Sequence, residues 1–188
     1  MPSLLVITHP EVTIDPDIPI TDWTLNEAGR HRAAAFAASE TFAGVTHIWT
    51  SAEKKACDTA EILARPRNLP VKVDPLLGEN DRSATGFLPP AEFEAAADAF
   101  FARPRISFCG WETAADAQAR IHHAVTSIIN RHDGADLAIV SHGAVGTLLW
   151  CGLSGSPIDR CHDQPSQGHY WCAELSTLKP ETAWRSIA

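Results

Sequence analysis

Two short, wholly apolar runs of this sequence each lead into a histidine. Residues 4–7 precede His9 and residues 137–140 precede His142, with one polar residue between run and histidine in both cases. Continuous aliphatic runs of this length are typical of strands that are buried on both faces. A sheet of such strands needs helices on both sides, and this requirement constrains the possible folds strongly.

Strand-like and helix-like segments alternate along the rest of the chain. Further strands are predicted at residues 45–50, 71–73 and near 169–175, and helices at 27–38, 53–64, 91–102, 112–131 and from 143 to about 153. Asn26 and Thr113 are good helix N-caps. The alternation predicts an α/β fold, specifically a three-layer α/β/α sandwich with a mostly parallel sheet. A chain of 188 residues fits a single domain, residues 1–188.

Composition excludes several classes of partner. Lys and Arg number 15 against 23 Asp and Glu, a net charge of −8. This balance argues against a broad basic face for nucleic acid and against binding to anionic membranes. The N-terminus lacks the basic region of a signal peptide, and the five cysteines have no disulfide-like spacing. We therefore expect a cytoplasmic protein with reduced cysteines and neither a nucleic-acid nor a membrane partner.

The two histidines are the strongest candidates for chemistry. The carboxyl ends of parallel strands face the ligand crevice of an α/β sheet, so His9 and His142 lie side by side if their strands are neighbours. Paired imidazoles can bind a metal, transfer protons or attack phosphorus. A metal would need further ligands, for which the sequence offers His122–His123, His132–Asp133 and Cys161–His162. A surface helix explains most of these residues, so no metal and no cofactor is expected, and a metal-dependent hydrolase is kept as an alternative.

Five segments together resemble the histidine phosphatase (phosphoglycerate mutase-like) superfamily. They occur in the family's order and span most of the chain: Thr8-His9-Pro10-Glu11, Leu25-Asn26-Glu27-Ala28-Gly29, the segment 48–61 with Thr50-Ser51 and Lys55-Ala56, Leu77-Gly78-Glu79, and Val140-Ser141-His142-Gly143. The resemblance implies a phosphoglycerate mutase-like fold. It also implies hydrolysis of a small phosphomonoester through a phosphohistidine.

The resemblance assigns three catalytic roles. His9 would be the nucleophile, His142 would hydrogen-bond the transferring phosphoryl oxygens, and Glu79 would give a proton to the leaving oxygen. A neutral imidazole is a good nucleophile at neutral pH, and a carboxylic acid with a raised pKa suits proton donation. The implied partner is a small phosphorylated molecule or another anion.

The implied substrate-binding positions depart from the family pattern. Thr8 and Lys55 stand where the family has arginines, and Pro10 stands where it has glycine. An arginine offers phosphate a fixed bidentate fork, whereas lysine is a mobile point charge and threonine is neutral. Ser51 and Gly143 are the other predicted binding residues, together with Arg82, a cation that follows Glu79 closely. These departures support an alternative: a catalytically weakened or inactive relative that binds a metabolite or a protein in the same crevice.

Residues 78–111 are rich in proline and aromatic side chains. We interpret this segment as a cap insertion that covers the crevice and influences the choice of substrate. Its aromatic side chains could also serve a homodimer contact.

Overall fold

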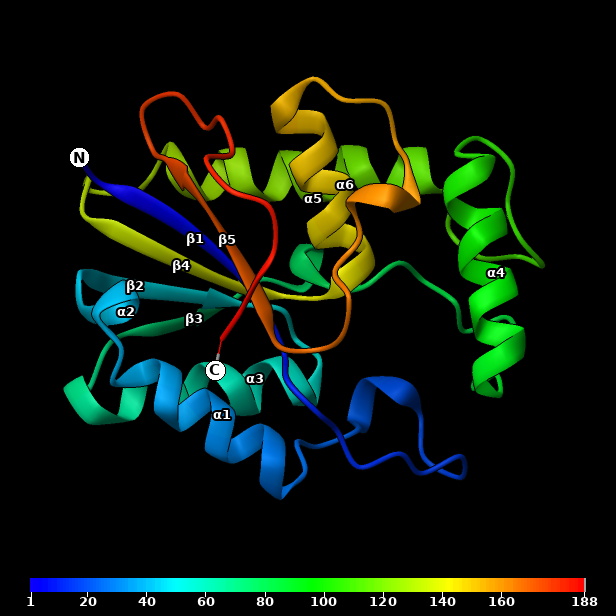
Figure 1. Cartoon of the computed structure of the whole chain (residues 1–188), viewed down its shortest axis with the longest axis horizontal. Coiled ribbons are helices and arrows are strands. Elements are labelled where there is room, and N and C mark those ends of the chain that lie inside the picture. Colours follow the sequence, from blue (N-terminus) through cyan, green and yellow to red (C-terminus); the bar gives the residue numbers. More distant parts are fainter. Residues whose placement is uncertain (188) are drawn as a thin grey trace.

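The computed structural model describes residues 1–187, and within them six strands form one sheet with helices on both faces (Figure 1). Across the sheet the order is β3-β2-β4-β1-β5-β6. In chain order the strands are β1 (Ser3–Thr8), β2 (Val45–Thr50), β3 (Val71–Val73), β4 (Asp136–Ser141), β5 (His169–Glu174) and β6 (Arg185–Ser186). The predicted three-layer α/β/α class is confirmed.

The sheet is parallel from β3 through β1 and antiparallel from there to its other edge. β4 pairs in parallel with both β1 and β2, while β5 runs antiparallel to β1 and to β6. In the register of the two central strands, Thr8 lies opposite Ser141. The next residue of each strand is a histidine, so the chain brings both histidines to the same edge of the sheet.

Six α-helices surround the sheet within the described residues. One face carries α1 (Glu27–Ala37), α2 (Glu40–Ala43) and α3 (Lys54–Ala64), and the other carries α5 (Ala114–Ile129) and α6 (Gly143–Ser154). α4 (Pro90–Ala102) stands beyond the carboxyl ends of the parallel strands (Figure 1). Short 3-10 turns occupy Ile20–Asp22 (η1), Arg65–Arg67 (η2), Pro75–Leu77 (η3) and Arg160–His162 (η4).

Strand alternation builds two separate cores. Leu4 and Val6 of β1 face the α5 and α6 side, whereas Leu5 and Ile7 face the α1 and α3 side. All four side chains are buried, as expected for a strand covered on both faces. Burial of this apolar surface fixes the strand register, because a shift by one residue would exchange the two faces.

Most predicted elements are present with small shifts at their ends. The predicted caps form: the side chain of Asn26 accepts a hydrogen bond from the N–H of Gly29, and that of Thr113 accepts one from Asp116. α2 and β6 were not predicted. α2 is only four residues long, and β6 is a two-residue strand that exists through its pairing with β5.

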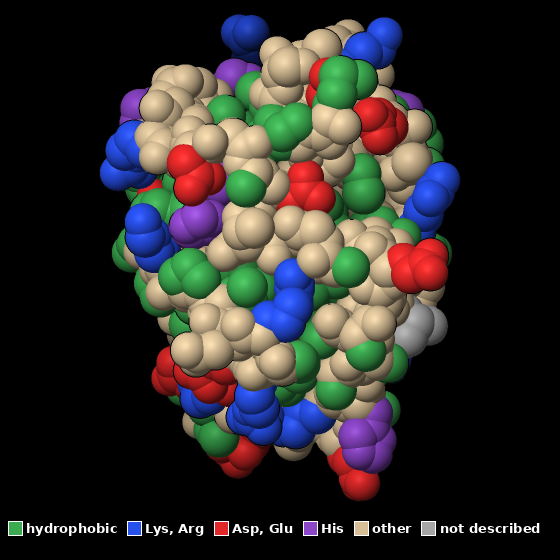
Figure 2. All heavy atoms as spheres, turned by 90° about the vertical axis from the view of Figure 1, so that its left-hand side faces the viewer, with side chains coloured by type: hydrophobic (Ala, Val, Ile, Leu, Met, Phe, Trp, Pro, Cys, Tyr) green, Lys and Arg blue, Asp and Glu red, His purple; other side chains and the backbone are tan. Residues whose placement is uncertain are grey.

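Surface features agree with the composition. Basic, acidic and histidine side chains are interspersed with hydrophobic ones over the face at the amino ends of the parallel strands (Figure 2). Among the helices of residues 1–187, none combines the length and apolar character needed to span a bilayer. All five cysteines carry free thiols.

Candidate active site

The rings of His9 and His142 lie together at the carboxyl edge of the sheet. Their centroids are 5.3 Å apart and their planes meet at 63°. His9 directly follows β1, and His142 follows β4 and is the N-cap residue of α6. His9 is 8% exposed and His142 is completely buried. The neighbouring positions of β1 and β4 therefore produce the side-by-side pair that the sequence predicts.

The ring of His9 is held in one orientation. Its Nδ1 lies 2.9 Å from the carbonyl oxygen of Pro10, which can only accept, so Nδ1 carries the proton and Nε2 carries the lone pair. Burial, with a further contribution from the Lys55 ammonium, lowers the pKa of His9 from 6.5 to about 4. The ring is therefore neutral at neutral pH, which is the form a nucleophile needs.

His142 is held through its other nitrogen. Its Nε2 lies 2.7 Å from Oγ of Ser51 and 3.3 Å from Oε1 of Glu53. Its Nδ1 is buried and has no hydrogen-bond partner among residues 1–187. Burial lowers the pKa of His142 well below the usual value, although Glu53 acts in the opposite direction.

Glu79 reaches the site from the segment after η3. Its carboxylate accepts backbone N–H groups of Val145 at 3.1 Å and Ala144 at 3.3 Å, in the first turn of α6. Burial raises the pKa of Glu79, although the nearby Arg82 lowers it. A carboxyl group with a raised pKa, next to two imidazoles, can keep a proton available for a leaving group.

Lys55 lines the cavity but is already partnered. Its Nζ donates to the carbonyl oxygen of Ile20 at 2.9 Å and forms an ion pair with Glu53. Burial raises the pKa of Glu53, but the imidazole of His142 and the ammonium of Lys55 outweigh burial and lower it to about 2. Glu53 is therefore ionised and offsets the charge of Lys55.

Glu53 is a site residue that the sequence reasoning missed. The motif resemblance assigns no residue type to its position, and an acidic residue before a helix is common for electrostatic reasons alone. Glu53 is the N-cap residue of α3, but its side chain makes no capping hydrogen bond. The carboxylate contacts His142 and Lys55 instead.

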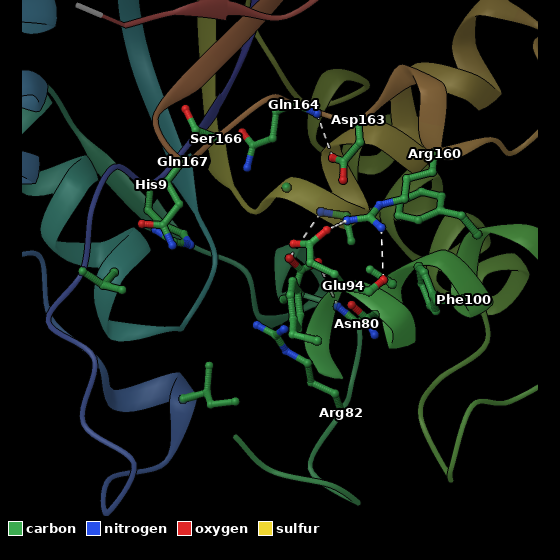
Figure 3. A pocket seen from close by; sticks show the side chains of 18 of the residues that line it. His9, Asn80, Arg82, Glu94, Phe100, Arg160, Asp163, Gln164, Ser166 and Gln167 are labelled. Carbon is green, nitrogen blue, oxygen red and sulfur yellow. Dashed lines mark hydrogen bonds and ion pairs between the residues drawn. The ribbon is translucent and has the colours of Figure 1, made fainter. Parts of the chain in front are cut away.

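Thr8 is predicted to bind substrate, but it does not line the cavity. Its side chain is buried, and its hydroxyl accepts the N–H of His169 at 3.0 Å and donates to Oε1 of Gln164 at 2.6 Å. Successive strand residues point to opposite faces, so Thr8 lies on the α6 face with Leu4 and Val6, where Gln164 and the N–H of His169 bind its hydroxyl. The nitrogen of the Gln164 amide points into the cavity instead (Figure 3).

Two further predicted binding positions, Ser51 and Gly143, differ from each other in whether they line the cavity. Ser51 is buried and is absent from the cavity lining, so its hydroxyl serves His142. Gly143 lines the cavity, and a Cβ at this position would lie 2.5 Å from Nε2 of Gln164. A side chain at residue 143 would therefore displace that amide.

The cavity beside His9 has a volume of about 330 Å³ (Figure 3). Polar side chains at its lining include Lys55, Glu79, Asn80 and Arg82, while α4 and its neighbourhood contribute both apolar residues, among them Phe93 and Phe100, and the ion pair between Glu94 and Arg160. The Arg82 guanidinium lies 5.0 Å from the ring centroid of Phe93. Asn80 is 5% exposed and its Nδ2 has no hydrogen-bond partner within residues 1–187, so a donor is available to a ligand there.

A separate histidine cluster lies elsewhere. Ligand atoms of His47, His132 and Asp133 fall within 4.8 Å of one another. His47 lies in the first half of β2, and the other two precede β4, so the cluster is away from the carboxyl edge that carries His9. Two cations, Lys72 and Arg131, line the same hollow. Their charge opposes metal binding, and the histidine pair of the site is not joined to this cluster.

The fold, with two histidines paired at the carboxyl edge of its sheet, places this chain in a class of phosphoryl-transfer proteins. The sequence profile of the histidine phosphatase superfamily (branch 1) matches residues 11–178, a range that begins two residues after His9 and includes Lys55, Glu79 and His142. The chain belongs to the histidine phosphatase superfamily. A comparison with curated proteins gives no match.

Solved structures with the same fold cover nearly the whole chain. YhfR of Bacillus stearothermophilus is 25% identical over 98% of this chain and 96% of its own, with a TM-score of 0.82. The mycobacterial glucosyl-3-phosphoglycerate phosphatase, in complex with inorganic phosphate, is 21% identical over 100% and 99%, with a TM-score of 0.80. The phosphoserine phosphatase of Entamoeba histolytica, in complex with 3-phosphoglyceric acid, is 18% identical over 99% and 98%, with a TM-score of 0.79.

Proposed function

We propose that this protein hydrolyses a small phosphomonoester through a phosphohistidine on His9. One observation carries the proposal: the carbonyl oxygen of Pro10 fixes the proton of His9 on Nδ1, which leaves the Nε2 lone pair for attack. His142 lies beside this ring, and the half-buried Glu79 lines the cavity next to His9. Superfamily membership supports phosphoryl transfer as the type of reaction.

In the first step, Nε2 of His9 attacks phosphorus and the bond from phosphorus to the ester oxygen breaks. The protonated carboxyl of Glu79 gives its proton to that oxygen, so the product leaves as a neutral alcohol. Burial raises the pKa of Glu79 and keeps the proton available. The Pro10 carbonyl oxygen stabilises the positive charge that develops on the His9 ring, because it accepts the Nδ1–H bond.

In the second step, water attacks the phosphohistidine. The Glu79 carboxylate now takes a proton from the water, whose oxygen bonds to phosphorus as the bond from Nε2 to phosphorus breaks. Inorganic phosphate forms, His9 regains its lone pair and Glu79 its proton. The step consumes one water and needs no other reactant.

Four donors around the cavity are proposed to hold the substrate. Lys55 and Arg82 supply positive charge, and the amides of Asn80 and Gln164 supply neutral donors. Fixed donors of this kind stabilise the charge that spreads over the phosphoryl oxygens during transfer. The names of two structural neighbours refer to phosphomonoesters, glucosyl-3-phosphoglycerate and phosphoserine. We propose the same broad class for this cavity.

Trapping the covalent intermediate tests the proposal. The protein is mixed with a panel of phosphomonoesters, quenched without acid, digested and examined by mass spectrometry. We expect a phosphoryl group on the peptide that contains His9, and none in a His9→Asn variant. Absence of both turnover and a trapped phosphoryl group across the panel would contradict the proposal.

The second candidate function is binding without turnover, in the same crevice. Two observations favour it. The ion pair with Glu53 reduces the attraction of Lys55 for phosphate, and the side chain of Thr8 is directed away from the cavity. A thermal-shift screen separates the two functions, because a ligand that binds the folded state raises the melting temperature. Stabilisation by phosphate or vanadate supports the hydrolase, whereas stabilisation only by unphosphorylated compounds supports the binding role.

A further inference from the structure

The side chain of Glu53 contacts three members of the candidate site. Its Oε1 lies 3.3 Å from Nε2 of His142 and accepts the backbone N–H of Glu79 at 2.8 Å, while its Oε2 pairs with Lys55. The side chain is 13% exposed, so these contacts are largely shielded from water. A carboxylate in this position acts on the site more strongly than one at the surface.

The surroundings of Nε2 indicate which nitrogen of His142 carries the proton. Nε2 lies 3.3 Å from the Glu53 carboxylate, which can only accept, and 2.7 Å from the hydroxyl of Ser51, which can accept as well as donate, so we assign the proton to Nε2. The lone pair of the neutral ring is then on Nδ1, which is buried without a partner among residues 1–187. His9 has the opposite arrangement, with its proton on Nδ1. The two adjacent rings are thus held in opposite tautomers.

His142 is fully buried and does not itself line the cavity, but its ring lies 5.3 Å from that of His9, so a phosphoryl group on His9 would be its neighbour. Phosphoryl oxygens of a dianion are acceptors, and an acceptor beside an unprotonated nitrogen gains no hydrogen bond. Nδ1 of His142 can donate to such an oxygen only after it takes up a proton. The resulting imidazolium would have Nε2–H directed at Glu53 and Nδ1–H directed at the phosphoryl group.

We infer that Glu53 is a positioning residue, which holds His142 in the Nε2–H form and stabilises the imidazolium that forms when a phosphoryl group occupies the site. The inference rests on the proposed function of His9. The proton comes from the substrate monoanion: its P–O–H proton moves to Nδ1 of His142, the ester becomes a dianion and the ring becomes a cation. No other bond changes in this transfer, and the proton returns to phosphate when the product leaves.

Glu53 is the acidic group in ion-pair contact with His142, and the neighbouring cations oppose its effect. The charged and titratable groups that act on the ring are His9 after β1, Glu53 and Lys55 at the start of α3, and Arg82 after η3, while Glu79 binds the first turn of the helix that follows His142. Lys55, Arg82 and a protonated His9 all disfavour a second positive charge. Removal of the Glu53 charge would therefore leave the imidazolium without its counter-ion.

Nitrogen NMR of ¹⁵N-histidine-labelled protein tests the inference without turnover. In the wild-type protein at neutral pH, we expect the His142 ring to be neutral with its proton on Nε2. Addition of saturating orthovanadate, which occupies the place of the phosphoryl group, is expected to give a doubly protonated His142. A free ring protonated on Nδ1, or a ring that vanadate leaves unchanged, would overturn the inference.

The variant Glu53→Gln supplies the kinetic readout. Activity that needs the His142 imidazolium is lost at high pH, so loss of the carboxylate should move this alkaline limb of the kcat profile to lower pH. We expect kcat to fall about 10- to 100-fold, the range found when a carboxylate that orients a metal-bound histidine is removed. Glu61→Gln, the same change at an exposed position of α3, should leave both kcat and the limb unchanged.

The two proposals fail in different ways. If His9 is phosphorylated but the Glu53→Gln profile matches that of wild type, the role of Glu53 is overturned and the hydrolase stands. If vanadate protonates His142 in the wild type but not in Glu53→Gln, while no substrate phosphorylates His9, the role of Glu53 stands and turnover is rejected.

Discussion

Arg120 on α5 holds the stretch of main chain that carries Glu79. Its guanidinium donates to the carbonyl oxygens of Gly78 at 3.0 Å and Glu79 at 3.2 Å, and also to that of Leu76 at 2.8 Å. Glu112 accepts two further hydrogen bonds from the same group. The main chain that carries the proposed acid is therefore held by a residue of α5, in addition to the contacts of Glu79 with Glu53 and α6.

Replacement of Arg120 by methionine should lower kcat while KM changes little. The segment after η3 loses three hydrogen bonds to its carbonyl oxygens, so Glu79 no longer stays at the leaving oxygen, and misplacement of a catalytic group can cost about 100-fold. Arg120→Lys should not restore activity, because one ammonium cannot reproduce the planar fork. Steady-state kinetics and melting curves check this, and an unchanged kcat in a folded variant would contradict it.

The variant Glu79→Gln should distinguish good leaving groups from poor ones. Glutamine cannot give a proton, so esters of ordinary alcohols should be hydrolysed about 10² to 10⁴ times more slowly. An ester of p-nitrophenol leaves as a stable phenolate and should be affected much less. The measurement is kcat for both ester types in wild type and variant. Equal losses for the two would show that Glu79 does not act as the acid.

A double-mutant cycle between Thr8 and Gln164 tests whether Thr8 contributes to phosphate binding through the Gln164 amide. Thr8→Val removes the hydroxyl that donates to Gln164 but keeps the shape of the side chain. We expect phosphate affinity to fall roughly fivefold to tenfold, the value of one hydrogen bond. In a Gln164→Leu background the same change should have little further effect, because Thr8 acts through this amide. Phosphate or vanadate inhibition constants give the four affinities, and strictly additive losses would argue against the coupling.

The stability of the protein should fall between pH 6.5 and about pH 4. His9 titrates at about 4 when folded and at 6.5 in the unfolded chain, so acid protonates the unfolded state first. The stability from the neutral ring is thus present above pH 6.5 and is lost as the pH falls toward 4. The full effect is about 3 kcal/mol.

Urea unfolding at a series of pH values measures this loss in the wild type and in His9→Asn. The free energy of unfolding of the variant should decline less steeply as the pH falls. The decline that remains comes from His142, because burial lowers the pKa of that residue as well. Parallel curves for the two proteins would mean that His9 does not contribute.

The sequence predicted the layers of the fold and the location of the site because both depend on local pattern. Continuous aliphatic runs identify β1 and β4 as strands buried on both faces, and the residues after each run must leave the sheet at its carboxyl edge. Asn26 and Thr113 mark helix starts through contacts within three residues of themselves. Such short-range signals do not require knowledge of the partners.

Short elements lacked a local signal of this kind. α2 spans four residues, and β6 spans two and exists only through its pairing with β5, so neither has a periodic pattern of its own.

The contacts among the site residues depend on packing between segments that are distant in the chain. Thr8 and Gln164 are 156 residues apart, yet they share a hydrogen bond that turns Thr8 away from the cavity it was predicted to line. Glu53 has no distinctive motif, but packing of α3 against β4 brings it to His142. The residue pattern alone is enough to show that His9 and His142 directly follow strands. The choice of proton position on each ring came from packing, because tautomer and ionisation depend on which acceptor lies within a few ångströms and how little water reaches it.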